Sequence, residues 1–436
     1  MKNNALRDST WWFVLGFSLC LLAGAVLRFG YNEATVNATA IQADAASYVR
    51  YANNLLHHGV FSKQRAENPQ PDSYWAPGYP AFLAALMIGG ESLGLESYRL
   101  ILAVQALLGV FTIYFTGLIA ARLLPFGLAL LPPALVALSP HLVAVGQNLL
   151  TETLFGFLIV AGLYFLIEGI YRQERGRLLA GGVVLALAWW VNPVSLLLAP
   201  ALALAIVWYW FRKGEAPQHA PVILAGVILP VVLTAGAWSM RNQIQVSASE
   251  LTSADRLLTN LIIGMHSDFH AIWRVNKRDP SNPADIDRKE IDGDYAKFAE
   301  RWAAKVTADP LGMLNWYLLE KPRVLWGWEV QIGFRDIYIY PIQYSLYDVS
   351  PVAGATYSVM RTLHLPLLVL GLLGVLVALG DRSSITPMIL CITLLYITFV
   401  YLATQSDPRY SFPLRGPLYI LAIYFPYRAW NLLLRR

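Results

Sequence analysis

The chain has 436 residues, of which 56% are hydrophobic and only 14% are charged, whereas a soluble domain carries roughly 25% charged residues. It has two cysteines and neither a GxGxxG nor a P-loop pattern, which excludes a disulfide framework and leaves a soluble-nucleotide site without a motif. The net charge of +5 is modest, and we expect no nucleic-acid partner. This composition predicts an all-α polytopic membrane protein.

About ten stretches are apolar enough to cross a membrane, which takes about 20 residues each. The first is interpreted as an uncleaved helix, because its apolar run is longer than that of a signal peptide. A shorter apolar segment, Gly78–Gly90, is expected to lie on the membrane as a juxtamembrane helix. The predicted spans are Trp11–Phe29, Leu100–Ala121, Leu123–Leu142, Leu154–Ile170, Leu178–Val191, Val194–Phe211, Pro221–Trp238, Ala353–Leu379, Ile385–Ala403 and Phe412–Leu433.

With this set of spans, the basic clusters all fall on one side, which the positive-inside rule assigns to the cytoplasm. Both termini are then cytoplasmic, Ser73 and Ala284 lie outside, and Gln173 and Gly214 lie inside. The basic residues concerned are Lys2, Arg7, Arg122, Arg172, Arg175, Arg177, Arg212, Lys213, Arg382, Arg435 and Arg436.

The same topology divides the chain into three parts. Residues 1–238 form an N-terminal transmembrane module whose first outer loop is 30–99. Residues 239–352 form a larger outer-face region, and residues 353–436 contain the last three spans. We expect the chain to be a multi-pass protein of the inner (cytoplasmic) membrane, with its polar site on the outer face.

The first outer loop opens with a carboxylate on a short amphipathic helix. Asp44, Tyr48, Tyr51 and Leu55 fall at i, i+4, i+7 and i+11, so they share one helix face, and Gly59 is placed to end the helix. An alternative is that Asp44 only caps the helix and the tyrosines lie at the lipid interface.

Other polar residues gather at the same ends of the predicted spans. Glu152, Asn192, Arg241 and Arg409 all converge on the leaflet of Asp44. Charged groups at membrane depth are unfavourable and usually mark a functional cavity. A carboxylate can accept the proton of a hydroxyl group, and arginines can hold a departing phosphate in a bidentate fork. This combination suits attack by an acceptor on a lipid-linked phosphate.

Four segments then carry a resemblance to a known family. They are Asp44-x3-Tyr48 with NLLHHGVFS, the turn APGYPAFLA, Leu150–Phe155 and Asp407–Leu414. Together they resemble the bacterial membrane glycosyltransferases of the C-type superfamily. The subgroup is that of the protein mannosyltransferases and lipid A aminoarabinose transferases, glycosyltransferase family 39-like.

The resemblance implies inverting transfer of a sugar from a polyprenyl-phosphate donor to a lipid, glycan or protein acceptor, next to membrane lipid. It implies that Asp44 is the catalytic base, that Glu152 is a supporting acid, and that Arg409 and Arg241 hold the phosphate. Tyr48, Trp75, Asn192 and Tyr410 would complete the substrate site, with Lys321 and Arg323 as lesser phosphate candidates.

The chain also departs from the family pattern. Ala45 follows Asp44 where a second acidic residue is usual, and Ala76-Pro77 replaces a Lys-Pro pair. The first outer loop that carries Asp44 contains no DxD motif, so we predict no cofactor and no metal site, although the use of a divalent cation stays open. Two alternatives remain: a transporter or flippase of lipid-linked sugars, or a non-catalytic relative in cell-envelope glycan assembly.

Overall fold

The computed structural model describes residues 2–434 except 38, 40, 215–217, 219, 277, 278, 280 and 335. The predicted basic residues Arg435 and Arg436 lie outside the described residues, as do the side chains of Lys2 and Arg7. The described part is almost entirely helical, with one short two-stranded sheet. The predicted all-α class is therefore confirmed.

Seven helices in the described part are long and apolar enough to cross a membrane. Each coincides with a predicted span, which makes the chain a multi-pass membrane protein. They are α1 (Lys2–Ala34, apolar from Trp11), α4 (Ser97–Leu123), α8 (Glu152–Arg172), the segment Pro193–Lys213 that joins the 3₁₀-helix η2 (Pro193–Ser195) to α10 (Leu198–Lys213), α11 (Ala220–Gln245), α19 (Pro351–Gly380) and α20 (Thr386–Ala403).

The predicted span Leu123–Leu142 is not one straight helix. It forms α5 (Phe126–Ala129), α6 (Leu131–Leu138) and α7 (Pro140–Ala144), followed by the 3₁₀-turn η1 (Val145–Gln147). The axis bends by 49° between α6 and α7. Ser139 has an extended backbone there, and Pro140 cannot continue a helix because it has no N–H group to donate. The predicted span is therefore a bent pair of helices that meets the length and apolarity of a span only when its two parts are taken together.

The two remaining predicted spans also form helices. They are α9 (Arg175–Val191) with 17 residues and α21 (Arg415–Leu433) with 19. Neither is among the seven helices that meet both the length and the apolarity of a span. The number of spans reaches the predicted ten only if the bent segment, α9 and α21 are added to the seven helices.

The first outer loop contains the two helices expected from its sequence. The first, α2 (Ala43–His58), ends at Gly59, which has a φ of 66°, the left-handed conformation that glycine adopts without strain. The second is α3 (Gly78–Leu93). A Cβ atom on Gly78 would lie 2.8 Å from the backbone of Trp190. The start of α3 therefore packs closely on the end of α9, and its orientation on the membrane stays a prediction.

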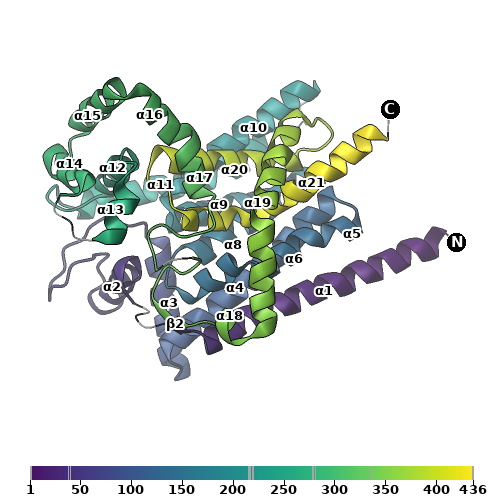
Figure 1. Cartoon of the computed structure of the whole chain (residues 1–436), viewed down its shortest axis with the longest axis horizontal. Helices are drawn as coiled ribbons and strands as arrows, with labels where there is room; N and C mark the ends of the chain where they lie inside the picture. The colour runs from purple at the N-terminus through teal and green to yellow at the C-terminus, as the bar shows by residue number, and fades with distance from the viewer. Residues whose placement is uncertain are drawn as a thin grey trace.

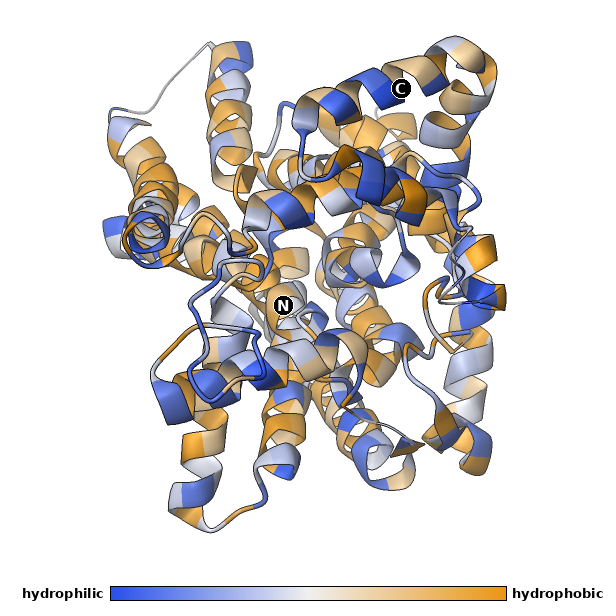
Figure 2. Ribbon diagram, turned by 90° about the vertical axis from the view of Figure 1, so that its left-hand side faces the viewer, coloured by the Kyte–Doolittle hydropathy of each residue, from blue (hydrophilic) through white to orange (hydrophobic). Residues whose placement is uncertain are grey.

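Region 239–352 begins inside α11 and continues as short elements. Its last strand, β2, pairs antiparallel with β1 (Val36–Asn37) from the first outer loop. Figure 2 shows hydrophilic segments interleaved with apolar ones on this side of the molecule. The elements are α12 (Ser253–Gly264), α13 (Phe269–Val275), α14 (Pro283–Ile291), α15 (Tyr295–Ala308), α16 (Pro310–Asn315), the π-turn η3 (Trp316–Glu320), α17 (Lys321–Leu325), β2 (Ile342–Tyr344) and α18 (Leu346–Val349).

Helix α8 lies at the centre of the helical core. It packs against α4, α9 and the 3₁₀-helix η4 (Pro408–Leu414). A Cβ atom on Gly181 of α9 would lie 2.8 Å from the backbone of Leu166 in α8, so the two helices approach as closely as small residues permit. The first residue of this buried helix is Glu152, which is therefore held in a fixed place.

Three basic residues of the predicted cytoplasmic loops lie at one end of the helical core. At one end, Arg122 and Arg172 both pair with the buried Glu168, and Arg212 donates to the carbonyl of Leu379. Both chain termini also lie towards this side, at the right of Figure 1, whereas α2 and α12–α15 lie at the left. Arg122, Arg172 and Arg212 thus lie at the same end of the core, and the assignment of that end to the cytoplasm stays a prediction.

Cysteine labelling of intact cells checks that assignment, but the structure changes the best positions. Ser73 and Ala284 are both buried, so we choose the exposed Asn68 and Lys289 instead. In a background with Cys20→Ser and Cys391→Ser, we expect an impermeant maleimide to label Asn68→Cys and Lys289→Cys but not Gln173→Cys. The reverse pattern would place the site on the cytoplasmic face.

Candidate active site

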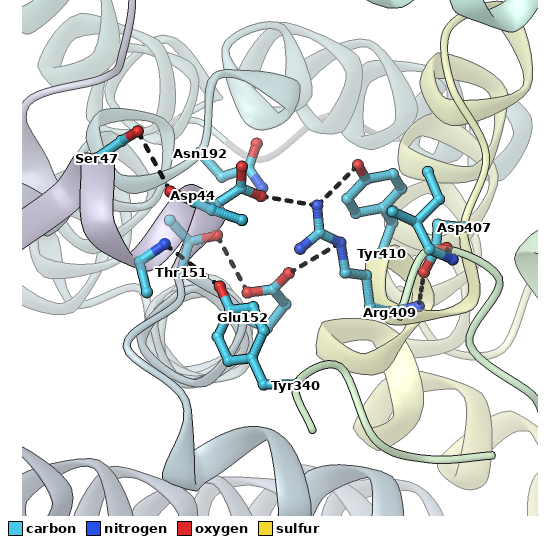
Figure 3. Close-up of polar contacts among 12 residues, drawn as sticks. Asp44, Ser47, Thr151, Glu152, Asn192, Tyr340, Asp407, Arg409 and Tyr410 are labelled. Carbon is cyan, nitrogen blue, oxygen red and sulfur yellow. Dashed lines mark hydrogen bonds and ion pairs between the residues drawn. The ribbon is translucent and has the colours of Figure 1, made fainter. Parts of the chain in front are cut away.

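Three charged side chains meet where α2, α8 and η4 come together (Figure 3). Nη2 of Arg409 donates to Oδ2 of Asp44 at 2.9 Å, and its Nε lies 3.9 Å from Oε1 of Glu152. The exposed fractions of the side chains are 33% for Asp44, 12% for Arg409 and 7% for Glu152. The guanidinium therefore lies between two carboxylates, and Asp44 is the more accessible of the two.

The start of α2 shows what Asp44 does in the fold. The N-cap residue is Gln42, and its side chain makes no capping hydrogen bond. Asp44 lies two residues further on, and its carboxylate accepts a hydrogen bond from Arg409. The alternative that Asp44 only caps this helix is therefore wrong.

Asp407 holds the backbone that carries Arg409. Its Oδ1 accepts the backbone N–H of Arg409 at 3.0 Å, and its Oδ2 accepts the N–H of Ile332 at 2.8 Å. This side chain is fully buried. Nη2 of Arg409 also donates to the hydroxyl of Tyr410 at 3.2 Å. The guanidinium is thus positioned by its neighbours before any ligand arrives.

A cavity of about 560 Å³ opens beside these charges, a size within the usual range of small-molecule sites. Its walls come from the first outer loop, the start of α8, the segment after α9, α12 and the segment after α20. Seven of the predicted site residues line it, and Arg241, Lys321 and Arg323 do not; the seven are Asp44, Tyr48, Trp75, Glu152, Asn192, Arg409 and Tyr410.

Aromatic side chains form two of the cavity walls. Tyr48 and Trp75 meet edge to face with ring centroids 4.6 Å apart. On another wall, Tyr401 and Tyr410 stack at 4.7 Å, and Nδ2 of Asn192 donates to the hydroxyl of Tyr401 at 3.2 Å. These walls offer apolar faces and a few fixed polar atoms, the usual composition of a small-molecule site.

Arg241 is the predicted site residue that the structure places elsewhere. It lies near the end of α11 and does not line the cavity. Nη1 of Arg241 donates to the carbonyl of Asp72 at 2.8 Å, and the guanidinium lies 4.9 Å from the ring centroid of Trp238. Arg241 ties the first outer loop to α11, because the Trp238-x2-Arg241 spacing brings its side chain to that loop.

The two lesser phosphate candidates also lie outside the cavity lining. Lys321 is fully buried and donates to the carbonyls of Leu402 and Thr404 at 2.6 and 2.7 Å. Burial lowers the pKa of Lys321 to about 7. Arg323, two residues on, is exposed. Lys321 therefore braces the segment that leads to Arg409.

Sequence reasoning missed three cavity or near-site residues. Arg256 of α12 enters the cavity with its guanidinium carbon 3.6 Å from the ring centroid of Trp75. Tyr401 comes from the last turn of α20, and the hydroxyl of Tyr340 accepts the backbone N–H of Ala45 at 3.3 Å. A capping box, Thr252 with Asp255, marks the start of α12 and could have been recognised.

The surroundings shift the pKa of two groups beside Asp44. Burial, together with the charge of Asp44, raises the pKa of Tyr340 above its ordinary value, so this phenol stays protonated at neutral pH. Burial opposes the charge of Arg409, but Tyr410 and the carboxylates of Asp44 and Glu152 outweigh it and raise its pKa. Arg409 therefore stays positively charged between the two acids.

The carboxylates do not form a ready metal site. Among the described residues, no group of three or more His, Cys, Asp or Glu side chains is placed to hold a metal ion. Asp44 and Glu152 instead share the guanidinium of Arg409. These residues do not fit a divalent cation at this position, because a positive charge already lies between them.

Comparisons with known proteins give structural matches alone: no family model and no curated protein matches the chain. The oligosaccharyltransferase AglB from Archaeoglobus fulgidus, in complex with an inhibitory peptide and a dolichol-phosphate, matches with a TM-score of 0.53 and 13% identity. The match covers 97% of this chain and 51% of that chain. The apo form of the Archaeoglobus fulgidus oligosaccharyltransferase gives a TM-score of 0.52 with 13% identity, over 97% of this chain and 52% of that one.

ArnT from Cupriavidus metallidurans in the apo state matches with a TM-score of 0.39 and 15% identity, over 97% of this chain and 78% of that one. The fold is shared with the archaeal oligosaccharyltransferase, and this chain spans about half the length of that protein. The chain thus has the polytopic fold of the C-type membrane glycosyltransferases, as the sequence motifs predicted.

Proposed function

We propose that this chain, which has the fold of the C-type membrane glycosyltransferases, transfers a sugar from a polyprenyl-phosphate donor to an acceptor by an inverting mechanism. The observation that carries the proposal is the array of Asp44, Arg409 and Glu152 beside a cavity at the ends of the spanning helices. The array lies at the end of the core opposite to Arg122 and Arg172. We infer that the reaction takes place on the outer face of the inner membrane.

In this proposal, Asp44 is the general base. It is the more exposed of the two carboxylates, and its Oδ2 lies 2.9 Å from Nη2 of Arg409, which fixes its position at the cavity. A bond forms between the acceptor oxygen and the anomeric carbon of the sugar as the bond from that carbon to the phosphate oxygen breaks. The proton of the acceptor passes to Asp44, and polyprenyl phosphate leaves with the electron pair.

Glu152 has a supporting role because it is nearly buried and faces Arg409 from the other side. It supplies the second carboxylate that Ala45 does not. The guanidinium lies between the two acids and offsets their charges. This arrangement weakens the case for a non-catalytic relative, which rested on the missing acid beside Asp44.

The lipid character of the donor is inferred from the setting of the cavity. Its walls include residues at the ends of α8 and α20, two helices apolar enough to span a membrane, and we infer that the prenyl chain leaves the cavity towards lipid there. The aromatic walls suit the faces of a sugar ring. The matching archaeal oligosaccharyltransferase was solved with a dolichol-phosphate, which supports a prenyl phosphate as the lipid part of the donor.

A transporter of lipid-linked sugars is the competing function. Transporters place their binding groups near the bilayer midplane, often on paired broken helices. Here Glu152 is the first residue of its helix, and Arg409 lies before α21 rather than within a span. The position of the charges at one end of the core favours chemistry at the membrane surface.

An assay with defined donors tests the proposal. The purified protein in lipid nanodiscs would be given a panel of polyprenyl-phosphate sugars with a cell-envelope lipid extract as acceptor. We expect release of free polyprenyl phosphate and a new glycosylated product with at least one donor. Movement of the intact donor across a vesicle membrane, without cleavage of the sugar–phosphate bond, would favour the transporter instead.

A further inference from the structure

A second guanidinium faces the cavity, and it differs from the first in its partners. Arg256 of α12 lies over the ring of Trp75 and is half-buried. Among the described residues, its guanidinium has no hydrogen bond to an acceptor and no carboxylate within ion-pair distance. The neighbouring Asp255 is already engaged, because its Oδ2 accepts hydrogen bonds from the backbone and hydroxyl of Thr252.

Arg409, in contrast, already lies between two carboxylates, although its Nε has no hydrogen-bond partner within the described part of the chain. It faces the carboxylates of Asp44 and Glu152, and a third acid, Asp407, accepts its backbone N–H. A phosphate placed against Arg409 would meet the repulsion of these acids at close range. A phosphate at Arg256 would meet a guanidinium that, within the described part of the chain, packs on an aromatic face and pairs with no carboxylate.

Helix α12 is held firmly enough to fix the position of Arg256. The carbonyl of Gly264, its last residue, accepts the indole N–H of Trp316 at 2.9 Å. A Cβ atom on Gly264 would lie 2.4 Å from the carbonyl oxygen of Thr404, so only glycine permits this approach. Thr404 also accepts from Lys321. The helix is thereby braced against the segment that forms the opposite wall of the cavity.

The geometry points to separate roles for the two arginines, an inference that rests on the proposed function. Arg256 binds the phosphate of the polyprenyl-phosphate donor, and Arg409 positions the two carboxylates. Region 239–352 then supplies a substrate-binding residue and is not only a cover over the site. The proposal reverses the expectation that Arg409 holds the phosphate. It adds a binding residue in a region without a family motif.

Binding of undecaprenyl phosphate and of undecaprenol to the protein in nanodiscs tests this division. We expect wild type to prefer the phosphate, and Arg256→Gln to bind the phosphate at least about tenfold more weakly, since it loses charged hydrogen bonds. Binding of undecaprenol should be unchanged, which checks that the variant is folded. Arg409→Lys should bind the phosphate within about threefold of wild type, because it keeps the charge balance of the site.

The matched control is Arg288→Gln on α14, since Arg288 pairs with Asp285 and does not line the cavity. Suppose that wild type prefers the phosphate. The inference is then wrong if Arg256→Gln binds undecaprenyl phosphate as tightly as wild type, or if Arg409→Lys loses as much affinity for it as Arg256→Gln does. In either case the proposed function stands. If wild type does not distinguish phosphate from alcohol, the proposed donor is itself wrong. Should Arg256→Gln not fold, Arg256→Lys decides: unchanged affinity contradicts the inference, and a threefold or greater loss supports it.

Discussion

Replacing Asp44 by asparagine is expected to lower the rate of sugar transfer by at least about a hundredfold, the range in which a positioned general base contributes. Asparagine keeps the size of the side chain, and its amide oxygen can still accept the hydrogen bond from Arg409. It cannot take a proton from the acceptor hydroxyl. Because Asp44 does not cap α2, the helix itself should be unaffected.

The measurement is the initial rate of transfer at matched membrane levels of each variant. Glu152→Gln should be less damaging, because Glu152 faces Arg409 from the buried side. The exposed Glu67→Gln in the same outer loop is a control that should keep wild-type activity. Activity largely retained in Asp44→Asn would mean that the base lies elsewhere. Failure of that variant to insert into the membrane would show that the ion pair between Asp44 and Arg409 is needed for folding or insertion.

The second large effect is expected at Arg409. Arg409→Lys should lower kcat by about tenfold or more while donor affinity changes little. The guanidinium reaches Asp44 through Nη2 and Glu152 through Nε at the same time. A lysine ammonium is a compact charge without that planar fork, so it can serve one carboxylate but not hold both in place. Lysine is preferable to alanine, because removing the charge would leave two acids close together without a partner.

Single-turnover kinetics with saturating donor separate the chemical step from binding. A loss confined to kcat, with an altered dependence of rate on pH, agrees with a role in positioning the two acids. An equal loss of donor affinity would contradict that role and would indicate that Arg409 binds the donor phosphate. Arg122 at the far end of the core also pairs with a buried carboxylate, that of Glu168, so Arg122→Lys is a control for loss of an arginine–carboxylate pair away from the site.

Much of the site could be predicted because it is encoded locally. The spacing from Asp44 to Leu55 and the glycine at position 59 specify α2, and the structure shows that helix with the expected end. Glu152 stands at the point where an apolar run begins, which is where α8 starts. Asp407 and Arg409 lie in a short motif whose backbone is ordered by its own side chains.

The contributions that were missed depend on contacts between distant segments. The place of α12 is set by Gly264 against Thr404 and by Trp316, and no periodicity within the helix specifies either contact. For the same reason the sequence placed Arg241 in the site, although its side chain is bound to the carbonyl of Asp72. A hydropathy pattern also cannot distinguish a straight span from the one that bends at Ser139 and Pro140.

The most direct test of the central claim is an experimental structure of the protein with bound undecaprenyl phosphate. The account predicts that the phosphate lies in the cavity within about 3 Å of the guanidinium of Arg256, on the side of Trp75. The prenyl chain should leave the cavity between the spanning helices, and the carboxylate of Asp44 should face the space where a sugar would be attached. A phosphate bound outside this cavity, or a cavity that takes no prenyl phosphate at all, would contradict the account.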